Sequence, residues 1–417
     1  MKVTSVKGTD DFLPKEAELR DYIMGVVLDT YKSFGFSRIY TPIVEDIENL
    51  EKSDGGDNLN LIFKVLKRGD KLKSAIDSND FDNLCDIGLR YDLTLPLSRF
   101  YSCHKQDLPQ TFKCIQVDQV FRAERPQKGR SREFVQCDID ILGSDKIESE
   151  IELIDVTANA LLNLGLKNFK VKINDRKILK NILIKLGFDE GSIESVCVSF
   201  DKLDKIGIDG VCQELQEKQF SANAIEKFRN FLNGNEKTLD DLFNIAGDMR
   251  EYENIKTILS SVKQLANGKY DICFDISLVR GQGYYTGTIF EIESEDYSCS
   301  IAGGGRYDNL IGKFDGQKVP AVGFSIGFER IFSILKDKNF VINKSKKKLA
   351  VIYSENDFVD AFSYAKKLQK DFDVSVVPYQ NKMGKLLSKL ENQDFDCYVM
   401  FDDKKDIKNL IKNGWGF

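Results

Sequence analysis

The sequence contains almost no histidine and no paired cysteines. His104 is the only histidine among 417 residues, which argues against a histidine-based metal site and leaves one imidazole for any Ser-His-Asp triad. The nine cysteines form no CxxC pair and their number is odd, which favours reduced thiols over a disulfide framework or a zinc site. We therefore predict no metal held by side chains.

Long apolar runs and a net positive charge are also missing. No apolar stretch approaches the roughly 20 residues that span a bilayer. The N-terminus, MKVTSVKGTDDFLPKE, has no apolar core that could serve as a signal peptide. Both absences predict a cytoplasmic protein with no membrane partner. The net charge of −6 means that any surface that binds nucleic acid would have to be local.

The composition that is present is that of a globular protein with several domains. The chain is 42% hydrophobic and 30% charged, and its length suits about two to four domains of roughly 100–200 residues each. Strand patterns at 110–122 and 132–142 and a helical pattern at 147–164 predict a sheet flanked by helices. Helical periodicity dominates 174–267. Strands and helices alternate over 349–401, which predicts a small parallel α/β unit.

Some shorter patterns also carry predictions. Residues 59–66 and 71–77 are interpreted as the two arms of a hairpin, and 324–335 as a helix. In the last unit the pattern predicts three strands and a short basic helix near the C-terminus.

The segment FRAERPQKGRSREFVQCDID, residues 121–140, is suited to binding a polyphosphate. Arginine forks bind phosphate oxygens bidentately, and Phe134 next to them could stack on a base. The basic side chains of the segment are Arg122, Arg125, Lys128, Arg130 and Arg132. On composition alone, a solvated hairpin explains the segment equally well.

Two glycine-rich segments follow in the second half of the chain. Arg280 lies in the turn of ISLVRGQGYYTGTIFEIE (276–293), and Arg306 follows the triple glycine of AGGGRYDNL (302–310). The triple glycine could cradle a phosphate, although a tight turn between core strands is the more common explanation.

Two further segments carry polar groups beside apolar runs. Arg330 near the start of a helix in AVGFSIGFERIFSIL (321–335) could reach a phosphate or a purine ring, or be one solvated arginine. Asp92 and Thr94 of LRYDLTLPL (89–97) would face the same side of a strand. They could accept hydrogen bonds from an ammonium group, or form a structural cap.

In order along the chain, these segments resemble the histidyl-tRNA synthetase family of class II aminoacyl-tRNA synthetases. The resemblance extends over roughly the first 335 residues. Six motifs carry it: KGTDDFLP (7–14), FGFSRIYTPIVE (34–45), FRAERPQKGRSREF (121–134), LVRGQGYYTGTIFE (278–291), AGGGRYDNL (302–310) and VGFSIGFERI (322–331).

The resemblance implies an α/β and α+β fold, in which a class II antiparallel sheet is flanked by helices. The catalytic core would comprise 1–173 and 268–338, separated by a helical insertion at 174–267. A linker, 339–348, would lead to a shortened, anticodon-binding-like α/β domain, 349–417.

The resemblance also implies an activity and a set of site residues. The chain would activate histidine with ATP, with Mg²⁺ bound together with the ATP, and transfer it to the 3′ end of the histidine tRNA as a homodimer. The implied histidine site comprises Asp92, Thr94, Arg122, Gln136, Asp140, Arg280, Tyr284 and Tyr285. The implied ATP site comprises Arg122, Glu124, Arg130, Phe134 and Arg330. Arg125 and Gln127 would contact the tRNA acceptor end, and Arg122 and Arg280 would be catalytic, since they would stabilise charge as the adenylate forms.

Two alternatives stay open. One is a catalytically silent, histidine-sensing regulatory subunit of ATP phosphoribosyltransferase, a paralogue with eroded ATP motifs; the arginines retained here favour catalysis. The other is an amino-acid-activating paralogue that does not act on tRNA, which the short C-terminal part leaves open. Gly283 also departs from the family, which usually has aspartate in the turn that presents Arg280.

Overall fold

The computed structural model describes most of the chain and divides it into two compact units. The units are Met1–Phe340 and Val341–Phe417, and each is described by itself. The described residues are 3–52, 56–126, 131–234, 238–246, 250–279, 284–297, 299–342, 345–354, 356–403 and 406–410.

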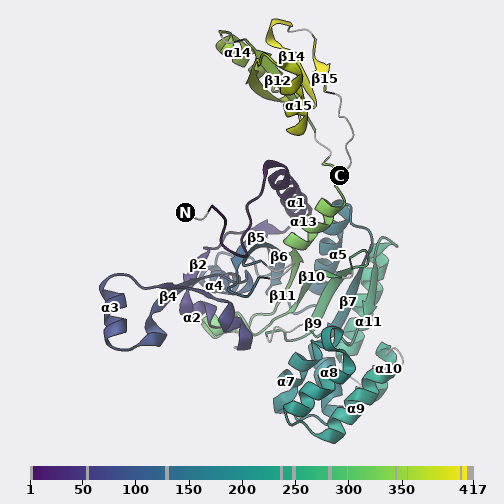
Figure 1. The fold of residues 1–417 in the computed structure, drawn as a ribbon. Coiled ribbons are helices and arrows are strands. Elements are labelled where there is room, and N and C mark those ends of the chain that lie inside the picture. Colours follow the sequence, from purple (N-terminus) through teal and green to yellow (C-terminus); the bar gives the residue numbers. More distant parts are fainter. Residues whose placement is uncertain are drawn as a thin grey trace. The chain divides into compact units, whose positions relative to one another are not determined.

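The large unit is built on one eight-stranded sheet (Figure 1). Its strand order is β1-β5-β6-β11-β10-β9-β7-β8; the β1/β5 and β7/β8 pairs are parallel and the other pairs antiparallel. The strand bounds are β1 Ser37–Arg38, β5 Phe112–Phe121, β6 Glu133–Leu142, β7 Phe169–Asp175, β8 Asp271–Phe274, β9 Thr288–Ser294, β10 Cys299–Arg306 and β11 Ala321–Gly327. The mostly antiparallel sheet flanked by helices is confirmed.

The two faces of this sheet differ in chemistry. On β6, Cys137, Ile139 and Ile141 are buried on the face that α1 (Pro14–Ser33), α5 (Glu148–Asn163) and α13 (Phe328–Asp337) cover. Because strand side chains alternate, Gln136 and Asp140 point to the opposite face. That face is polar, and it forms the floor of the candidate site.

A smaller three-stranded sheet lies beside the large one, in the order β2-β4-β3. The elements around it are β2 Val44–Asp46, α2 Ile47–Leu50, η1 Gly56–Leu61, β3 Phe63–Leu66, α3 Asp70–Asp77, η2 Phe81–Asn83, β4 Cys85–Leu89, α4 Thr94–His104 and α12 Gly312–Asp315. The hairpin predicted for 59–66 and 71–77 is wrong, because the second segment is helix α3, which extends away from the main sheet (Figure 1). Leu72 and Ala75 are three residues apart, a helical spacing, and Ala75 is buried.

The region predicted to be helical consists of consecutive helices. They are α6 Arg176–Leu186, η3 Glu190–Ser192, α7 Ile193–Phe200, α8 Leu203–Glu217, α9 Ala222–Asn233, α10 Leu239–Ala246 and α11 Arg250–Ala266. Phe228 is central to their core, with ring centroids 5.9 Å from Phe188 and 5.2 Å from Phe200, both edge-on. Gly207 interrupts α8 with φ 68°, a conformation that glycine adopts without strain.

The helix predicted for 324–335 begins only at Phe328, because strand β11 occupies 321–327. β11 pairs with β6 on one side and β10 on the other. Val322, Phe324 and Ile326 alternate with small residues, and this period of two is the strand signal within the segment.

The second unit is a four-stranded sheet in the order β13-β12-β14-β15. The bounds are β12 Lys347–Tyr353, α14 Phe358–Leu368, β13 Phe372–Pro378, α15 Met383–Asn392, β14 Cys397–Met400, η4 Phe401–Asp403 and β15 Lys408–Asn409. The three predicted strands are present and pair in parallel. The basic helix expected after them is wrong in its described part, which forms the antiparallel strand β15; residues 411–417 lie outside the described residues. Among the helices described in either unit, none is both long and apolar enough to cross a bilayer.

Candidate active site

Asp92 lies at the turn between β4 and α4. Its Oδ1 accepts a hydrogen bond from the backbone N–H of Leu95 at 3.2 Å, so the predicted structural cap exists. Thr94 is the first residue of α4 and does not lie on a strand. The Asp92 side chain is buried, and burial raises its pKa to about 6, although the Leu95 N–H and the charge of Arg122 act in the opposite direction.

Arg122 directly follows strand β5. Its side chain contacts both the turn that holds Asp92 and strand β6. Its Nε donates to the carbonyl oxygen of Tyr91 at 3.1 Å. Its guanidinium carbon lies 4.9 Å from the centroid of the Phe134 ring, within the range of a cation–π contact. The structure therefore brings together Asp92, Arg122 and Phe134, three of the residues that the resemblance implies for the site.

The N-terminal segment holds the stem of the arginine-rich loop. The backbone N–H of Arg132 donates to the carbonyl oxygen of Gly8 at 2.7 Å, and Arg132 Nε donates to the carbonyl oxygen of Glu124 at 3.1 Å. Gly8 has φ +89°, and a Cβ there would lie 2.6 Å from Cγ of Pro126. Arg132 is thus a structural residue. The side chain of Arg125 is exposed at the start of the loop, and Gln127, Lys128 and Arg130 lie outside the described residues.

Asp140 is the buried carboxyl at the centre of the polar face. The hydroxyl of Tyr307 donates to its Oδ1 at 2.6 Å. Burial raises the pKa of Asp140 to about 7; the Tyr307 hydrogen bond lowers it and the Asp92 charge raises it further. Gly323 lies opposite on β11, and a Cβ there would meet Asp140 Oδ1 at 2.0 Å. Only glycine leaves room for this carboxyl.

Two further tyrosines, Tyr284 and Tyr285, belong to the ring cluster that includes Tyr307, the partner of Asp140. The ring of Tyr284 lies 4.8 Å from that of Tyr285 and 6.1 Å from that of Tyr307, between centroids. Thr94 lies close enough to the Tyr284 hydroxyl to lower its pKa, against the larger effect of burial, which raises it. The predicted histidine-binding residues at 94, 140, 284 and 285 therefore belong to one cluster. Tyr307 was missed from the sequence, although it directly follows Arg306 in a segment that was singled out.

Gln136 and Asp138 complete the floor on strand β6. Gln136 Nε2 donates to Ser325 Oγ at 3.4 Å. Its Oε1 and the Oδ1 of Asp138 are buried, and neither has a hydrogen-bond partner among the described residues. Burial, together with the charges of Asp140 and Asp92, raises the pKa of Asp138 well above its ordinary value. Asp138 was not predicted, yet it shares the face of Gln136 and Asp140 by simple alternation.

Arg330 lies on the first turn of α13. It donates to the carbonyl oxygen of Ser300, and its Cδ lies beside Gly327, which pairs with Gln136. Its neighbour Glu329 forms a bidentate ion pair with Arg20 of α1, at 2.6 and 2.8 Å. The ion pair of Glu329 therefore fixes the start of α13 to α1, and the hydrogen bond of Arg330 fixes it to the sheet.

Comparisons with known proteins agree with this arrangement. Residues 8–331 match the sequence model of the histidyl-tRNA synthetase family. The chain belongs to this family. It is 45% identical to a histidine–tRNA ligase of Leifsonia xyli subsp. xyli (strain CTCB07) over 80% of each chain. It is 35% identical to that of Azobacteroides pseudotrichonymphae genomovar. CFP2, over 98% of this chain and 93% of the relative.

Solved structures of the family have the same fold. The crystal structure of histidyl-tRNA synthetase from Nostoc sp. PCC 7120 aligns with a TM-score of 0.79 at 26% identity, covering 96% of this chain and 92% of that one. A Bacillus halodurans structure titled as an ATP phosphoribosyltransferase regulatory subunit/histidyl-tRNA synthetase aligns at 0.77 with 19% identity, covering 95% and 98%. At that identity the second match concerns the fold alone.

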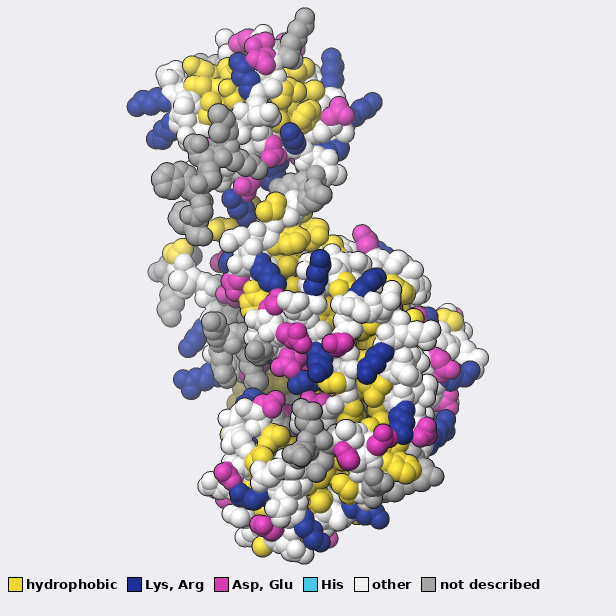
Figure 2. Space-filling view, turned by 90° about the vertical axis from the view of Figure 1, so that its right-hand side faces the viewer, with side chains coloured by type: hydrophobic (Ala, Val, Ile, Leu, Met, Phe, Trp, Pro, Cys, Tyr) yellow, Lys and Arg dark blue, Asp and Glu magenta, His cyan; other side chains and the backbone are white. Residues whose placement is uncertain are grey.

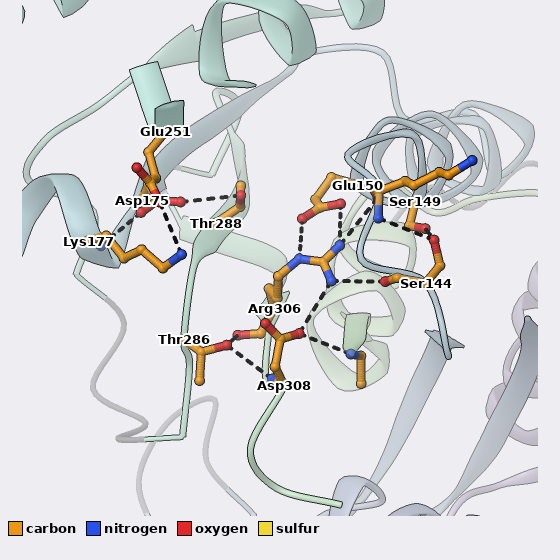
Figure 3. Close-up of polar contacts among 12 residues, drawn as sticks. Ser144, Ser149, Glu150, Asp175, Lys177, Glu251, Thr286, Thr288, Arg306 and Asp308 are labelled. Carbon is orange, nitrogen blue, oxygen red and sulfur yellow. Dashed lines mark hydrogen bonds and ion pairs between the residues drawn. The ribbon is translucent and has the colours of Figure 1, made fainter. Parts of the chain in front are cut away.

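In this synthetase-family chain the triple-glycine segment is structural. Arg306 Nε and Nη2 donate to the two carboxylate oxygens of the buried Glu150, at 2.6 and 2.7 Å (Figure 3). Its Nη1 donates to the carbonyl oxygen of Ser144 at 3.0 Å. A Cβ at Gly304 would lie 2.0 Å from the carbonyl oxygen of Gly323. The segment is strand β10, so both the phosphate cradle and the tight turn are wrong.

Side chains at the end of β7 and the start of α6 hold the backbone just before Arg280. Asn174 Nδ2 donates to the carbonyl oxygens of Ile276 at 3.2 Å and Leu278 at 2.9 Å. Arg176 Nη1 donates to that of Val279 at 3.4 Å. Arg280 and Gly283 themselves lie outside the described residues.

Asp175 lies between these two residues, as the last residue of β7 and the N-cap of α6. Its Oδ1 accepts from the backbone N–H of Lys177 at 2.8 Å, and its Oδ2 accepts from the Thr288 hydroxyl at 3.5 Å (Figure 3). Burial raises the pKa of Asp175 to about 6. This carboxyl is engaged as a helix cap and does not belong to the polar floor.

The candidate site has an excess of buried acceptors. Asp92, Asp138 and Asp140 all have raised pKa values, and Arg122 is the positive charge that acts on two of them. A ligand that brings its own positive charge would stabilise the ionised carboxylates. In the part of the chain that the structure describes, no group of three or more His, Cys, Asp or Glu side chains is placed to hold a metal ion.

Proposed function

We propose that this chain is a histidine–tRNA ligase. It activates histidine with ATP to histidyl-adenylate and diphosphate, and then transfers the histidyl group to the 3′ end of the histidine tRNA. The observation that supports this most strongly is the buried Asp140, held by Tyr307 and given room by Gly323. An acidic group enclosed by tyrosines in a member of this family suits an imidazole, which both donates and accepts hydrogen bonds.

Histidine would be recognised at both of its ends. Asp140 and Tyr285 would bind the two imidazole nitrogens, with Tyr284 adjacent. Asp92, Thr94 and Gln136 would bind the α-ammonium group. Because the site pairs both ring nitrogens, an apolar analogue would leave buried polar groups unpaired, and such sites reject analogues strongly.

The chemical step requires orientation and charge and no general base from the protein. The substrate carboxylate is already a nucleophile: its oxygen attacks the α-phosphorus, and the bond to the diphosphate breaks. Arg122 and Arg280 would stabilise the charge that develops at the α-phosphate.

The nucleotide would lie along the arginine-rich loop. Phe134 and Arg330 would enclose the adenine, Glu124 would accept from its amino group, and Arg130 would hold the distal phosphates. Mg²⁺ would enter together with ATP, bound to its phosphates.

The tRNA would contact more than one part of the chain. Arg125 and Gln127 would contact the acceptor end. Both lie in 1–173, which together with 268–338 would form the catalytic core. On the face shown in Figure 2, side chains of Lys and Arg are interspersed with those of Asp and Glu, so a tRNA contact would be built from local groups. We propose that the chain acts in the cytoplasm as a homodimer.

The parts beyond the catalytic core have proposed roles as well. The helical part 174–267 would be an insertion, and 339–348 would link the core to the anticodon-binding-like domain, 349–417. On α14 of that domain Phe358, Val359 and Phe362 are 48%, 73% and 43% exposed. Exposed aromatic rings are suited to stacking on unpaired bases. Replacing Phe358 and Phe362 by alanine should lower tRNA charging while histidine-dependent exchange is unchanged.

Two assays separate this proposal from its alternatives: histidine-dependent exchange of diphosphate into ATP, and charging of purified histidine tRNA. A ligase performs both. A silent histidine-sensing subunit performs neither, and an activating paralogue with another acceptor performs exchange alone. Arg280→Ala should abolish exchange and leave histidine binding largely intact; exchange that survives would contradict its proposed role.

A further inference from the structure

We propose that Arg20 of α1 positions the nucleotide by holding the carboxylate of Glu329. Glu329 in turn fixes the spacing between Phe134 and Arg330, which are proposed to enclose the adenine. The inference rests on the proposed histidine–tRNA ligase function and concerns its nucleotide site. Arg20 and Glu329 are positioning residues, since both act on the nucleotide through other side chains.

Glu329 binds β6 at the point where the neighbouring strand β11 ends. The two strands pair as far as Gly327 and Gln136, and helix α13 begins at the next residue, Phe328. Val135 therefore lies beyond the end of β11. Its backbone N–H donates to Oε1 of Glu329 at 3.2 Å. The carboxylate thus supplies the acceptor that a longer β11 would have supplied to β6.

This hydrogen bond connects the two groups that would enclose the adenine. The N–H of Val135 belongs to the peptide plane that follows Phe134, and a peptide plane is rigid. Glu329 directly precedes Arg330 on the first turn of α13. The carboxylate therefore fixes the backbone of Phe134 relative to the backbone of Arg330, and with it the width of the space between the two side chains.

Each of the two side chains also has a contact of its own. The guanidinium carbon of Arg122 lies 4.9 Å from the centroid of the Phe134 ring, and Arg330 donates to the carbonyl oxygen of Ser300 on β10. These contacts direct the side chains, whereas Glu329 sets the distance between the backbone segments that carry them.

Arg20 sets the orientation of the Glu329 carboxylate. Its Nη1 donates to Oε2 at 2.6 Å and its Nη2 donates to Oε1 at 2.8 Å. Two parallel bonds from a guanidinium fix the plane of a carboxylate, which a single donor does not. The Glu329 side chain is 27% exposed. Without Arg20 it would keep only the hydrogen bond from Val135 and could turn toward water.

Three aromatic rings hold the guanidinium of Arg20. Its central carbon lies 3.9 Å from the ring centroid of Phe12, 4.6 Å from that of Phe328 and 5.3 Å from that of Phe332, distances typical of cation–π contacts. The Arg20 side chain is 14% exposed. An ion pair between two exposed, flexible side chains contributes little, whereas here the rings restrict the guanidinium and shield the pair from water.

A second ion pair joins the same two helices away from β6. Lys336 of α13 donates to Oε1 of Glu16 of α1 at 2.6 Å. Oε2 of Glu16 accepts from the backbone N–H of Leu13, and the Lys336 ammonium lies 5.9 Å from the ring centroid of Phe332. This pair is a control for the effect of attaching α1 to α13 as such.

Three substitutions remove different parts of the Arg20–Glu329–Val135 bridge. Arg20→Met removes the charge and both donors and leaves an unbranched apolar side chain among the three rings. Glu329→Ala removes the contacts with both Arg20 and Val135. Glu329→Gln keeps an oxygen for the Val135 N–H, so its effect should lie between those of the wild type and Glu329→Ala. Because Arg20 acts only through Glu329, adding Arg20→Met to Glu329→Ala should cause no further change.

The test compares two competitors of ATP that differ in the adenine. Adenosine has the base and no phosphate; tripolyphosphate has the phosphates and no base. Each is measured as an inhibitor of histidine-dependent ATP–diphosphate exchange by the full chain, at constant free Mg²⁺. Arg20→Met and Glu329→Ala should each raise the KM for ATP and the inhibition constant of adenosine about five-fold, less than the loss of about ten-fold expected when the stacking ring of Phe134 is itself removed. The KM for histidine and the constant for tripolyphosphate should stay within about two-fold.

Lys336→Gln is the matched control. It breaks the other ion pair between α1 and α13 and should leave all four constants within about two-fold of the wild type. If it raises the adenosine constant as much as Arg20→Met does, the attachment of α1 to α13 is responsible and the bridge is not.

Three further results would overturn the bridge. They are an equal weakening of adenosine and tripolyphosphate, an unchanged adenosine constant in Arg20→Met, and an additional loss when Arg20→Met is combined with Glu329→Ala. A wild-type chain without histidine-dependent exchange would contradict the ligase function as well, whereas an active wild type with unaffected variants contradicts the bridge alone.

Discussion

The replacement Asp140→Asn should make the protein's stability less sensitive to pH. Asp140 is 4% exposed, and its pKa is raised from 3.8 to about 7, chiefly by burial. The folded state therefore keeps this carboxyl protonated at pH values where the unfolded chain has lost the proton. Its contribution to stability is fully present below pH 4 and is lost as the pH rises toward and through 7. Asparagine keeps an oxygen for the Tyr307 hydroxyl and cannot ionise.

The size of the effect follows from the two pKa values. A difference of about three pKa units corresponds to about 4 kcal/mol over the whole titration, at about 1.36 kcal/mol per unit. Part of that loss has already occurred at pH 5, which leaves about 2–3 kcal/mol between pH 5 and pH 8. The stability of Asp140→Asn relative to the wild type should therefore improve by about that amount over this interval.

Urea unfolding of both proteins at pH 5, 6, 7 and 8, followed by circular dichroism, measures the difference directly. Asp296→Asn is a suitable control, because Lys338 and Asn168 lower the pKa of Asp296 by hydrogen bonds, so that its titration lies below this interval. Its difference from the wild type should not change from pH 5 to 8. A difference between Asp140→Asn and the wild type that is constant, or that changes in the opposite direction, would refute the reasoning.

Three substitutions test other parts of the site. Phe134→Ala should raise the KM for ATP about ten-fold, with a smaller effect on the KM for histidine in the exchange assay, because an aromatic stack on a base is worth about 1–3 kcal/mol. Gly323→Ala should abolish exchange, since its Cβ would lie 2.0 Å from Oδ1 of Asp140. Gly25→Ala is the matched control: no atom lies within 4 Å of the added Cβ, so it should leave exchange unchanged. Glu150→Gln should lower the free energy of unfolding by about 1.5–3 kcal/mol in urea, because it removes a buried hydrogen-bonded charge and leaves Arg306 only the ion pair with Asp308 at 3.3 Å. A loss below about 1 kcal/mol would show that the ion pair with Glu150 does not stabilise the fold.

The period of two in the sequence was sufficient to predict a strand where apolar and polar residues alternate clearly along it. The alternation in 132–142 identified β6, and in the structure Gln136 and Asp140 lie on one face of that strand. The prediction failed at 324–327. There strand β11 is followed directly by helix α13, so the apolar residues of the strand were counted as part of the helix. It also failed at α3, whose eight residues are too few for a clear distinction between periods.

The site residues that the sequence missed depend on contacts between distant segments. Tyr307 reaches Asp140 across 167 positions of sequence, and Arg306 reaches Glu150 across 156. No local pattern reports such a partner, so the sequence alone did not show that the charge of Arg306 is neutralised by a buried carboxylate. Asp138 is different, because the alternation of β6 contained the signal and the resemblance drew attention to its neighbours.

The amino-acid requirement of ATP–diphosphate exchange tests the central claim most directly. The purified full-length chain, assayed with each of the common amino acids in turn, should incorporate diphosphate into ATP with histidine and with no other. Exchange supported by a different amino acid, or no exchange with histidine, would contradict the assignment of the floor around Asp140 as a histidine site.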